Sequence, residues 1–175
     1  MLTVLIEAAD DAPALGGTLA SLVSGAVEGL VREVVVLDVG LDAGTRKVAD
    51  HAGCKVAPAS GLAAVVSAAK GEWLLLIEAG ARLSPDWIES VHEHLAEVEA
   101  GTRTPRAARF SRAARDRPGL LARWRQRRTA LAEGLILPKP QAVGLSKSGC
   151  SIEAMGKGVA STRLEATIRP ALRKA

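Results

Sequence analysis

The chain has 175 residues, of which 48% are hydrophobic, and a formal net charge of +4. This size allows one substantial core, so a single domain is expected, and no stretch is long and apolar enough to predict a transmembrane helix. The first residues are apolar without a basic start, so a signal peptide is not predicted. Two distant cysteines, Cys54 and Cys150, match no metal or redox spacing and are typical of a reducing cytoplasm.

Charge is distributed unevenly along the chain. Residues 1–101 hold 6 Lys or Arg against 15 Asp or Glu, whereas residues 102–175 hold 17 against 4. We therefore divide the predicted domain into an acidic half, residues 1–101, and a basic half, residues 102–175. The asymmetry indicates either an anionic partner for the second half or attraction between the two halves.

The first half alternates between apolar strands and helices. Leu2 to Ile6 is predicted as a strand, and Asp10 or Asp11 as the cap of the helix that follows. The next elements are a strand at 33–38, a helix from Thr45 through Ala52, a strand at 54–57, a helix at 61–70 capped by Ser60, and a strand at 73–77. This alternation predicts a parallel sheet with right-handed crossovers. The first turn lacks the Gly-x-Gly-x-x-Gly pattern, which argues against a dinucleotide site.

The strand at Trp73–Ile77 is expected to be buried. Its five large apolar residues lack polar alternation, which is typical of a strand covered on both faces. Glu78 follows at once, Gly80 opens the turn, and Ser84 with Pro85 is predicted to start a helix. Ligands bind beyond the carboxyl ends of parallel strands, so Glu78 is a candidate for chemistry. The alternative, that Glu78 only ends a strand in solvent, stays equally open.

The second half is less regular. The pattern predicts an edge strand at 104–111, a helix at 116–133, a loop at 137–140, a short helix at 151–155 that ends at Gly156, and a last helix at 164–172. Pro170 indicates that this last helix is short.

Three segments of the first half together resemble the motifs of family 2 glycosyltransferases, which have the GT-A fold. Asp10-Asp11 follows the first strand, where the family has Asn-Glu. The second strand ends in Asp38-Val39-Gly40-Leu41-Asp42-Ala43-Gly44-Thr45, which is similar to Asp-Gly-Gly-Ser-Thr-Asp-Gly-Thr. The fourth strand and its turn, Gly71 through Gly80, are similar to Gly-Asp-Trp-Leu-Leu-Phe-Leu followed by Asp-x-Asp. The resemblance covers residues 2 to about 100 and is weaker beyond, so it implies a three-layer, Rossmann-like α/β domain with a mostly parallel sheet.

The resemblance implies a nucleotide-sugar donor at the carboxyl ends of the strands. Asp38 corresponds to the residue that binds the donor base in the family. A carboxylate suits this role, since it accepts the hydrogen bond of a base imino N–H. Asp10, Asp11, Gly40, Glu78 and Gly80 occupy the other donor-binding positions. In the family, the Asp-x-Asp pair holds Mg²⁺ or Mn²⁺ on the donor diphosphate. Glu78 is therefore the expected metal ligand, whereas Gly80 replaces the second acid.

The family's catalytic base is a carboxylate on a helix late in the chain, and Glu165 corresponds to it. Three functions stay open. The first is sugar transfer from a nucleotide-sugar donor to an unknown acceptor, lipid-linked acceptors included. The second is a degenerate homologue that binds a nucleotide or a partner, because Glu78-Ala79-Gly80 lacks the second acid.

The third function is an anionic-surface binding module built on Arg103–Arg128, which would bring the protein to the inner face of the membrane as a peripheral component. A solvated basic face that balances the acidic half also explains this arginine run. One Phe and no Tyr leave little for base stacking, which argues against nucleic acid as a partner.

Overall fold

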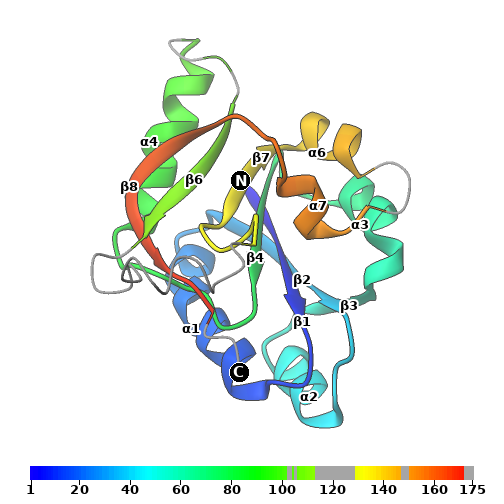
Figure 1. Ribbon diagram of the computed structural model, residues 1–175. Helices are drawn as coiled ribbons and strands as arrows, with labels where there is room; N and C mark the ends of the chain where they lie inside the picture. The colour runs from blue at the N-terminus through cyan, green and yellow to red at the C-terminus, as the bar shows by residue number, and fades with distance from the viewer. Residues whose placement is uncertain (102–103, 105, 113–128, 147–149, 172–175) are drawn as a thin grey trace, which may run out of the picture.

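The computed structural model describes residues 1–101, 104, 106–112, 129–146 and 150–171. One eight-stranded sheet, in the order β3-β2-β1-β4-β7-β6-β8-β5, lies between two layers of helices (Figure 1), which confirms the predicted three-layer α/β fold. The strands are β1 Leu2–Ala8, β2 Val31–Asp38, β3 Lys55–Pro58, β4 Trp73–Glu78, β5 Arg82–Leu83, β6 Ala107–Arg112, β7 Leu135–Pro138 and β8 Ser161–Arg169. The helices are α1 Ala12–Val27, α2 Ala43–His51, α3 Leu62–Ala68, α4 Trp87–Glu99, α6 Lys139–Leu145 and α7 Ile152–Gly156, with a 3₁₀ turn, η1, at Ala59–Gly61.

The sheet is mostly parallel. Strands β3, β2, β1 and β4 run parallel to one another, with Leu5 of β1 between Val35 and Leu76. Beyond β4, β7 pairs antiparallel with both β4 and β6, and β8 then runs parallel to β6. The carboxyl ends of β1, β2, β4, β6 and β8 therefore point to the same edge of the sheet.

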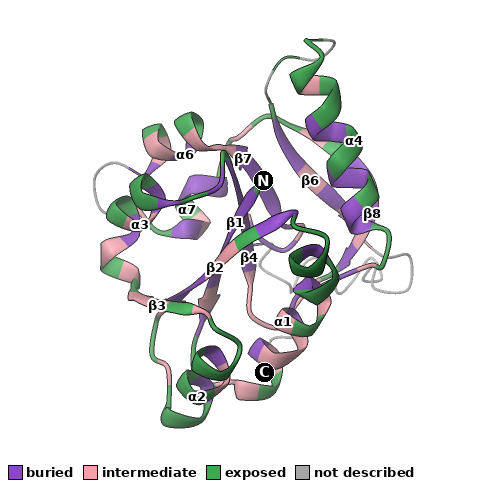
Figure 2. Cartoon of the chain, turned by 180° about the vertical axis from the view of Figure 1, so that it is seen from behind, coloured by how far each residue is buried: buried purple, intermediate pink, exposed green. Residues whose placement is uncertain are grey.

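Strand alternation divides the hydrophobic core between the two faces of the sheet. On β4, Trp73, Leu75 and Ile77 pack in the cluster that contains α1 and α4, whereas Leu74 and Leu76 pack in the cluster that contains α3, α6 and α7. The strands are buried along the middle of the molecule and the outer helix faces are exposed (Figure 2). Continuous apolar strands are expected for a sheet covered on both sides.

A hydrogen-bond network ties the amino ends of the parallel strands together. Thr3 of β1 is fully buried, and its hydroxyl accepts from the backbone N–H of Gly71 at 2.9 Å and donates to Glu33 of β2 at 3.1 Å. The Glu33 carboxylate also accepts from the Lys70 N–H and from Lys55 Nζ, each at 2.7 Å. Glu33 therefore links β2 to β3 and to the turn before β4.

One of the predicted helix caps is confirmed, and those at Thr45, Ser60 and Ser84 are wrong. Asp11 caps α1, as predicted, and Ser151, for which no cap was predicted, caps α7. Asp42 replaces Thr45 as the cap of α2, because its Oδ1 accepts from the Thr45 N–H at 2.7 Å. Ser60 lies inside η1 and caps no helix.

Ser84 is not the cap of α4 but an anchor for β8. The Ser84 N–H donates to the Thr167 carbonyl at 2.9 Å, and its hydroxyl accepts from the Thr167 N–H at 2.9 Å. A serine that precedes a helix can thus bind a distant strand instead of the helix terminus.

The second half corrects several predictions. The strand predicted at 104–111 exists as β6, but it lies between β7 and β8 and not at an edge. The loop predicted at 137–140 is the end of β7 and the start of α6. The helix predicted at 164–172 is wrong: Leu164, Ala166 and Ile168 are buried in alternation with more exposed neighbours, so the segment forms β8. The helix predicted at 116–133 lies outside the described residues up to 128, and 130–133 form a turn.

Candidate functional site

The carboxyl ends of three neighbouring parallel strands bring the predicted site residues to one edge of the sheet. Asp38 ends β2 and is in register with Ala8 of β1, and Glu78 ends β4 in register with Glu7. Asp10 and Asp11 follow β1, which lies between the other two strands. The alternation of each strand directs Asp38 to the face of α1 and α2 and Glu78 to the face of α7. The structure thus places Asp38 and Glu78 at the same edge but on opposite faces.

Asp38 is held by its own loop. Its Oδ1 accepts from the backbone N–H groups of Gly40 and Leu41, both at 2.9 Å, and its Oδ2 pairs with Arg46 of α2 at 2.6 Å. The Leu41 and Gly40 N–H groups, and then Arg46, lower the pKa of this carboxyl. Asp38 is consequently ionised at neutral pH, and its side chain is 25% exposed, so the carboxylate is accessible from solvent.

Gly40 and Asp11 shape the backbone at the same edge of the sheet. Gly40 has φ +120°, a conformation that favours glycine and that turns its N–H toward Asp38. Asp11 accepts from the Ala14 N–H at 3.0 Å and so begins α1. Asp10 precedes it and is exposed. Of the two acidic residues after β1, Asp11 therefore has a structural task and Asp10 faces solvent.

The turn after β4 requires the glycine that stands in place of a second acid. Gly80 has φ +96°, and its N–H donates to Thr18 Oγ1 of α1 at 2.8 Å. The Thr18 hydroxyl donates in turn to the Ala81 carbonyl at 2.8 Å. A side chain at position 80 would begin 3.1 Å from Ala171 Cβ and 3.5 Å from Ala14 Cβ. Gly80 is thus selected by the turn and its contact with α1.

The donor atoms at this turn do not fit a divalent cation held by the protein alone. Mg²⁺ and Mn²⁺ bind several hard oxygen ligands, and the turn offers the single carboxylate of Glu78. Within the described ranges, no three Asp, Glu, His or Cys residues form a group that could hold a metal ion. Glu78 as a metal ligand therefore stays a prediction from the resemblance.

Sequence reasoning missed two carboxylates near this turn: Glu7, in register with Glu78, and Glu153, whose charge acts on Glu7. Glu7 of β1 is half-buried, and burial raises its pKa, as do the negative charges of Glu78 and of Glu153 on α7. The signal for Glu7 was present in the sequence, because Leu5 and Glu7 share one face of a strand. The approach of Glu153 depends on how α7 packs, which no local pattern shows.

Glu165, the residue predicted as a catalytic base, does not lie on a helix. It is exposed in the middle of β8, opposite the buried side chains of Leu164 and Ala166. Only the residues 157–160 connect α7 to β8, so the helix that the resemblance implies does not occur there. This correction leaves Glu165 without the structural context that its assignment needed.

Within the described ranges, no helix is long and apolar enough to cross a bilayer. Of the arginine run Arg103–Arg128, the described members Arg106, Arg109 and Arg112 precede or belong to β6 and not to a helix. These three arginines therefore form no basic helical face.

Comparison with known proteins supports the fold. No family model matches the sequence, and no curated protein matches it either. Among solved structures, mannosyl-3-phosphoglycerate synthase from Rubrobacter xylanophilus is 16% identical, with a TM-score of 0.57 over 81% of this chain and 54% of that one. TarS (residues 1–349) from S. aureus is 12% identical, with a TM-score of 0.65 over 97% of this chain and 60% of that one.

A third similar structure is glucosyl-3-phosphoglycerate synthase from Mycobacterium tuberculosis in complex with Mn²⁺, UDP and glucosyl-3-phosphoglycerate. It is 16% identical, with a TM-score of 0.59 over 99% of this chain and 73% of that one. At such identities the likeness shows the fold, which is the GT-A fold of glycosyltransferases. The chain spans little more than half the length of the mannosyl enzyme.

Proposed function

We propose that the protein is a glycosyltransferase that binds a nucleotide-sugar donor where β1, β2 and β4 end. The observation that carries this proposal is the strand register, which sets Asp38 and Glu78 on either side of β1 within a GT-A fold. The similar M. tuberculosis enzyme was solved with Mn²⁺ and UDP-glucose, which makes UDP-glucose the first donor to test. Membership of family 2 rests on the sequence motifs.

In this proposal Asp38 recognises the base. Its ionised carboxylate accepts the imino N–H of uracil, and Oδ2 exchanges its contact with the exposed Arg46 for that hydrogen bond. The two backbone N–H groups on Oδ1 keep the carboxylate oriented, so the base meets a preformed acceptor. Glu78 lies at the end of β4, where the resemblance expects the donor diphosphate. The sugar acceptor, lipid-linked or soluble, approaches the same edge.

Calorimetric titration with UDP-glucose, GDP-mannose and dTDP-glucose tests the donor site. We expect wild type to bind at least one of the three, and Asp38→Ala to weaken that binding at least tenfold by loss of a hydrogen bond to a charged acceptor. Asp50→Ala is the matched control, because Asp50 is an exposed aspartate on α2, the helix that carries Arg46. Equal loss in both variants, or no binding by wild type, would overturn the proposal.

A second candidate is a nucleotide-binding homologue without transferase activity. Three observations favour it: Gly80 in place of a second acid, the strand position of Glu165, and the position of Glu7 next to Glu78. The negative charge of Glu7 and Glu78 opposes a donor diphosphate at this turn. Donor binding without release of UDP, with or without Mn²⁺, would select this candidate over the enzyme.

Two further expectations rest on the sequence alone. A cytoplasmic location is expected because Cys54 and Cys150 match no disulfide, metal or redox spacing. A peripheral contact with anionic membranes is expected from the charge of Arg103–Arg128, of which residues 103, 105 and 113–128 lie outside the described part of the chain. Both stay predictions.

A further inference from the structure

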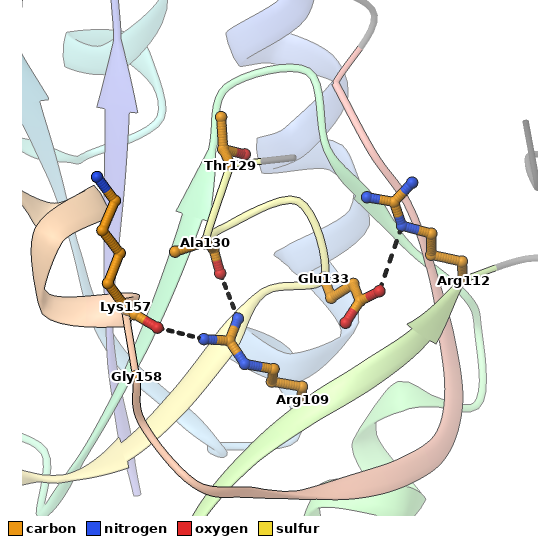
Figure 3. Close-up of a pocket in the computed structure, with 8 residues that line it drawn as sticks. Arg109, Arg112, Thr129, Ala130, Glu133, Lys157 and Gly158 are labelled. Carbon is orange, nitrogen blue, oxygen red and sulfur yellow. Dashed lines mark hydrogen bonds and ion pairs between the residues drawn. The ribbon is translucent and has the colours of Figure 1, made fainter. Parts of the chain in front are cut away.

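A cationic cavity lies beside the candidate donor site. Its volume is about 290 Å³, at the small end of ligand pockets, and it opens between β6, the turn at 129–134 and the end of α7 (Figure 3). Among the described residues that line it, Arg109, Arg112 and Lys157 are cationic, and Glu133 is the acidic one. The lining therefore carries an excess of positive charge.

Among the described residues, this positive charge is not balanced by negative charge. Glu133 is shared, since its two oxygens lie 3.4 Å from Arg112 Nε and 3.4 Å from Arg163 Nη2. Arg109 donates to neutral backbone carbonyls instead: to Ala130, to Gly156 at 2.7 Å and to Gly134 at 3.5 Å. Burial, followed by the nearby Arg163, lowers the pKa of Arg109, although Glu133 raises it. Among the described residues of the lining, the carboxylate of Glu133 is thus the single negative charge beside several arginines in a partly desolvated cavity.

Two buried polar atoms in the lining have no hydrogen-bond partner among the residues that the structure describes. Thr129 is 9% exposed, and its hydroxyl oxygen is buried and unpaired. The Arg112 side chain is 11% exposed, and its Nε contacts Glu133 at 3.4 Å without a hydrogen bond. Buried polar groups normally form hydrogen bonds, so a hydroxyl without one and a guanidinium N–H that has only an ion pair indicate room for a further acceptor in this cavity. An oxyanion accepts from both.

The cavity wall is preformed. The Arg109 guanidinium fastens the 130–134 turn to the last residue of α7, and a Cβ at Gly156 would lie 2.8 Å from Ala130 Cβ. The site thus needs the close approach that glycine allows. On the other side, a Cβ at Gly134 would lie 3.3 Å from Ile77 Cγ2, and Ile77 directly precedes Glu78. The cavity therefore adjoins the edge at which β4 ends.

We propose that this cavity binds the phosphate group of a small soluble phosphomonoester. A phosphate dianion offers three acceptor oxygens and two negative charges, which suits the unpaired hydroxyl, the unpaired guanidinium N–H and the excess of cations better than a single carboxylate does. The identification of this molecule with the sugar acceptor rests on the proposed function, because it uses the position of the cavity beside Glu78. Phosphate binding in the cavity does not itself require a nucleotide-sugar donor.

Titration with inorganic phosphate and with glycerol 3-phosphate, at ionic strength held constant with sodium chloride, tests the site. We expect one bound phosphate per chain, about tenfold weaker binding in Thr129→Val, and a similar or larger loss in Arg112→Gln. Thr129→Val preserves shape and charge, so it remains informative if Arg112→Gln fails to fold. Arg106→Gln is the matched control, because Arg106 is an exposed arginine just before β6 and does not line the cavity.

Each outcome decides the proposal. No saturable binding of phosphate by wild type, or equal losses in Arg106→Gln and Arg112→Gln, would show non-specific charge attraction and overturn it. Binding only to phosphatidylcholine vesicles that contain phosphatidic acid would assign the cations to a lipid surface instead. Asp38→Ala separates the two sites: it should weaken nucleotide-sugar binding at least tenfold and leave phosphate affinity unchanged. If wild type binds phosphate but no nucleotide sugar, the anion site stands and its role as an acceptor site fails.

Discussion

At the scale of single residues, Glu7 combines a position in the core sheet with an unfavourable charge. Its carboxyl is half-buried and faces Glu78 on the neighbouring strand, so its folded-state pKa lies above the ordinary value. The unfolded chain releases this proton at lower pH than the folded chain does. Stability is therefore lost as the pH rises from the unfolded pKa through the raised folded pKa.

We expect Glu7→Gln to stabilise the protein at neutral pH and to leave it unchanged at pH values below the ordinary range of a glutamate. The gain should not exceed about 1 kcal/mol, because water screens a half-exposed carboxylate. Urea unfolding at several pH values measures it, with the exposed Glu72→Gln as control. A loss of stability at neutral pH in Glu7→Gln would contradict the assignment of Glu7 as a strained charge.

A second prediction at this scale concerns Gly80. Gly80→Asp would give two acidic residues, at 78 and 80, with the spacing of the Asp-x-Asp motif. The backbone at φ +96° and the contact with Ala171 oppose any side chain at position 80, however. We expect a loss of about 1–3 kcal/mol in stability and no gain in Mn²⁺ affinity. Gly80→Ala should lose a similar amount, since both strain and contact begin at Cβ. A stable Gly80→Asp variant that binds Mn²⁺ tightly would refute the structural role of this glycine.

At the scale of secondary-structure elements, we expect substitution of two glycines of α1 by alanine to change the stability of the protein in opposite directions. Near Gly16, a Cβ would meet only Val48 Cγ1 at 4.0 Å, whereas at Gly25 it would lie 2.4 Å from the ring of buried Trp87 on α4. Gly16→Ala should raise stability by about 0.5–1 kcal/mol, the usual helix preference for alanine. Gly25→Ala should lower it, because overpacking costs about 1–3 kcal/mol and exceeds that gain.

Thermal unfolding of both variants is the measurement, and each serves as the control for the other, since the substitution and the helix are the same. If Gly25→Ala were as stable as Gly16→Ala, α1 would not pack on α4 as closely as described. The pair thus tests the helix layer on one face of the sheet.

The same scale shows what the sequence could predict. The strands β1, β2, β3 and β4 were found because buried parallel strands are continuous apolar runs between helices with clear starts. β8 was mistaken for a helix because Leu164 and Ile168 are also four residues apart, a spacing that a strand and a helix share. The place of β6 inside the sheet depends on β7, which inserts beside β4 from a distant part of the chain.

The candidate site was predictable to a similar extent. Asp38 and Glu78 each follow an apolar run, so their common edge follows from parallel pairing. The cavity could not be predicted, because Arg109 and Arg112 are three residues apart on one strand and would ordinarily face opposite sides. A register shift between β6 and β8 at Arg109/Ser111 accompanies their approach to one cavity.

At the scale of the whole molecule, the acidic and basic halves share one sheet. β4 of residues 1–101 pairs with β7 of residues 102–175, and β5 pairs with β8. A fragment of residues 1–101 would leave the apolar strand β4 as an open edge and uncover Ile77 and its neighbours. We expect this fragment to bind a hydrophobic dye and to unfold without a cooperative transition. A cooperative transition in the isolated fragment would show instead that the acidic half is an independent domain.

The two edges of the parallel part of the sheet respond to acid in opposite ways. At the edge where these strands begin, burial raises the pKa of Glu33 of β2, but the hydrogen bonds from Lys55, Lys70 and Thr3 outweigh burial and lower it. Acid that protonates Glu33 therefore loosens the amino end of the sheet, whereas acid that protonates Glu7 relieves the repulsion beside the candidate donor site. Between the two titrations lies an interval around the ordinary pKa of a glutamate, in which Glu33 is ionised and Glu7 is protonated. In a buffer within that interval, the edge at Glu78 is less negative, and more receptive to an anion, than at neutral pH.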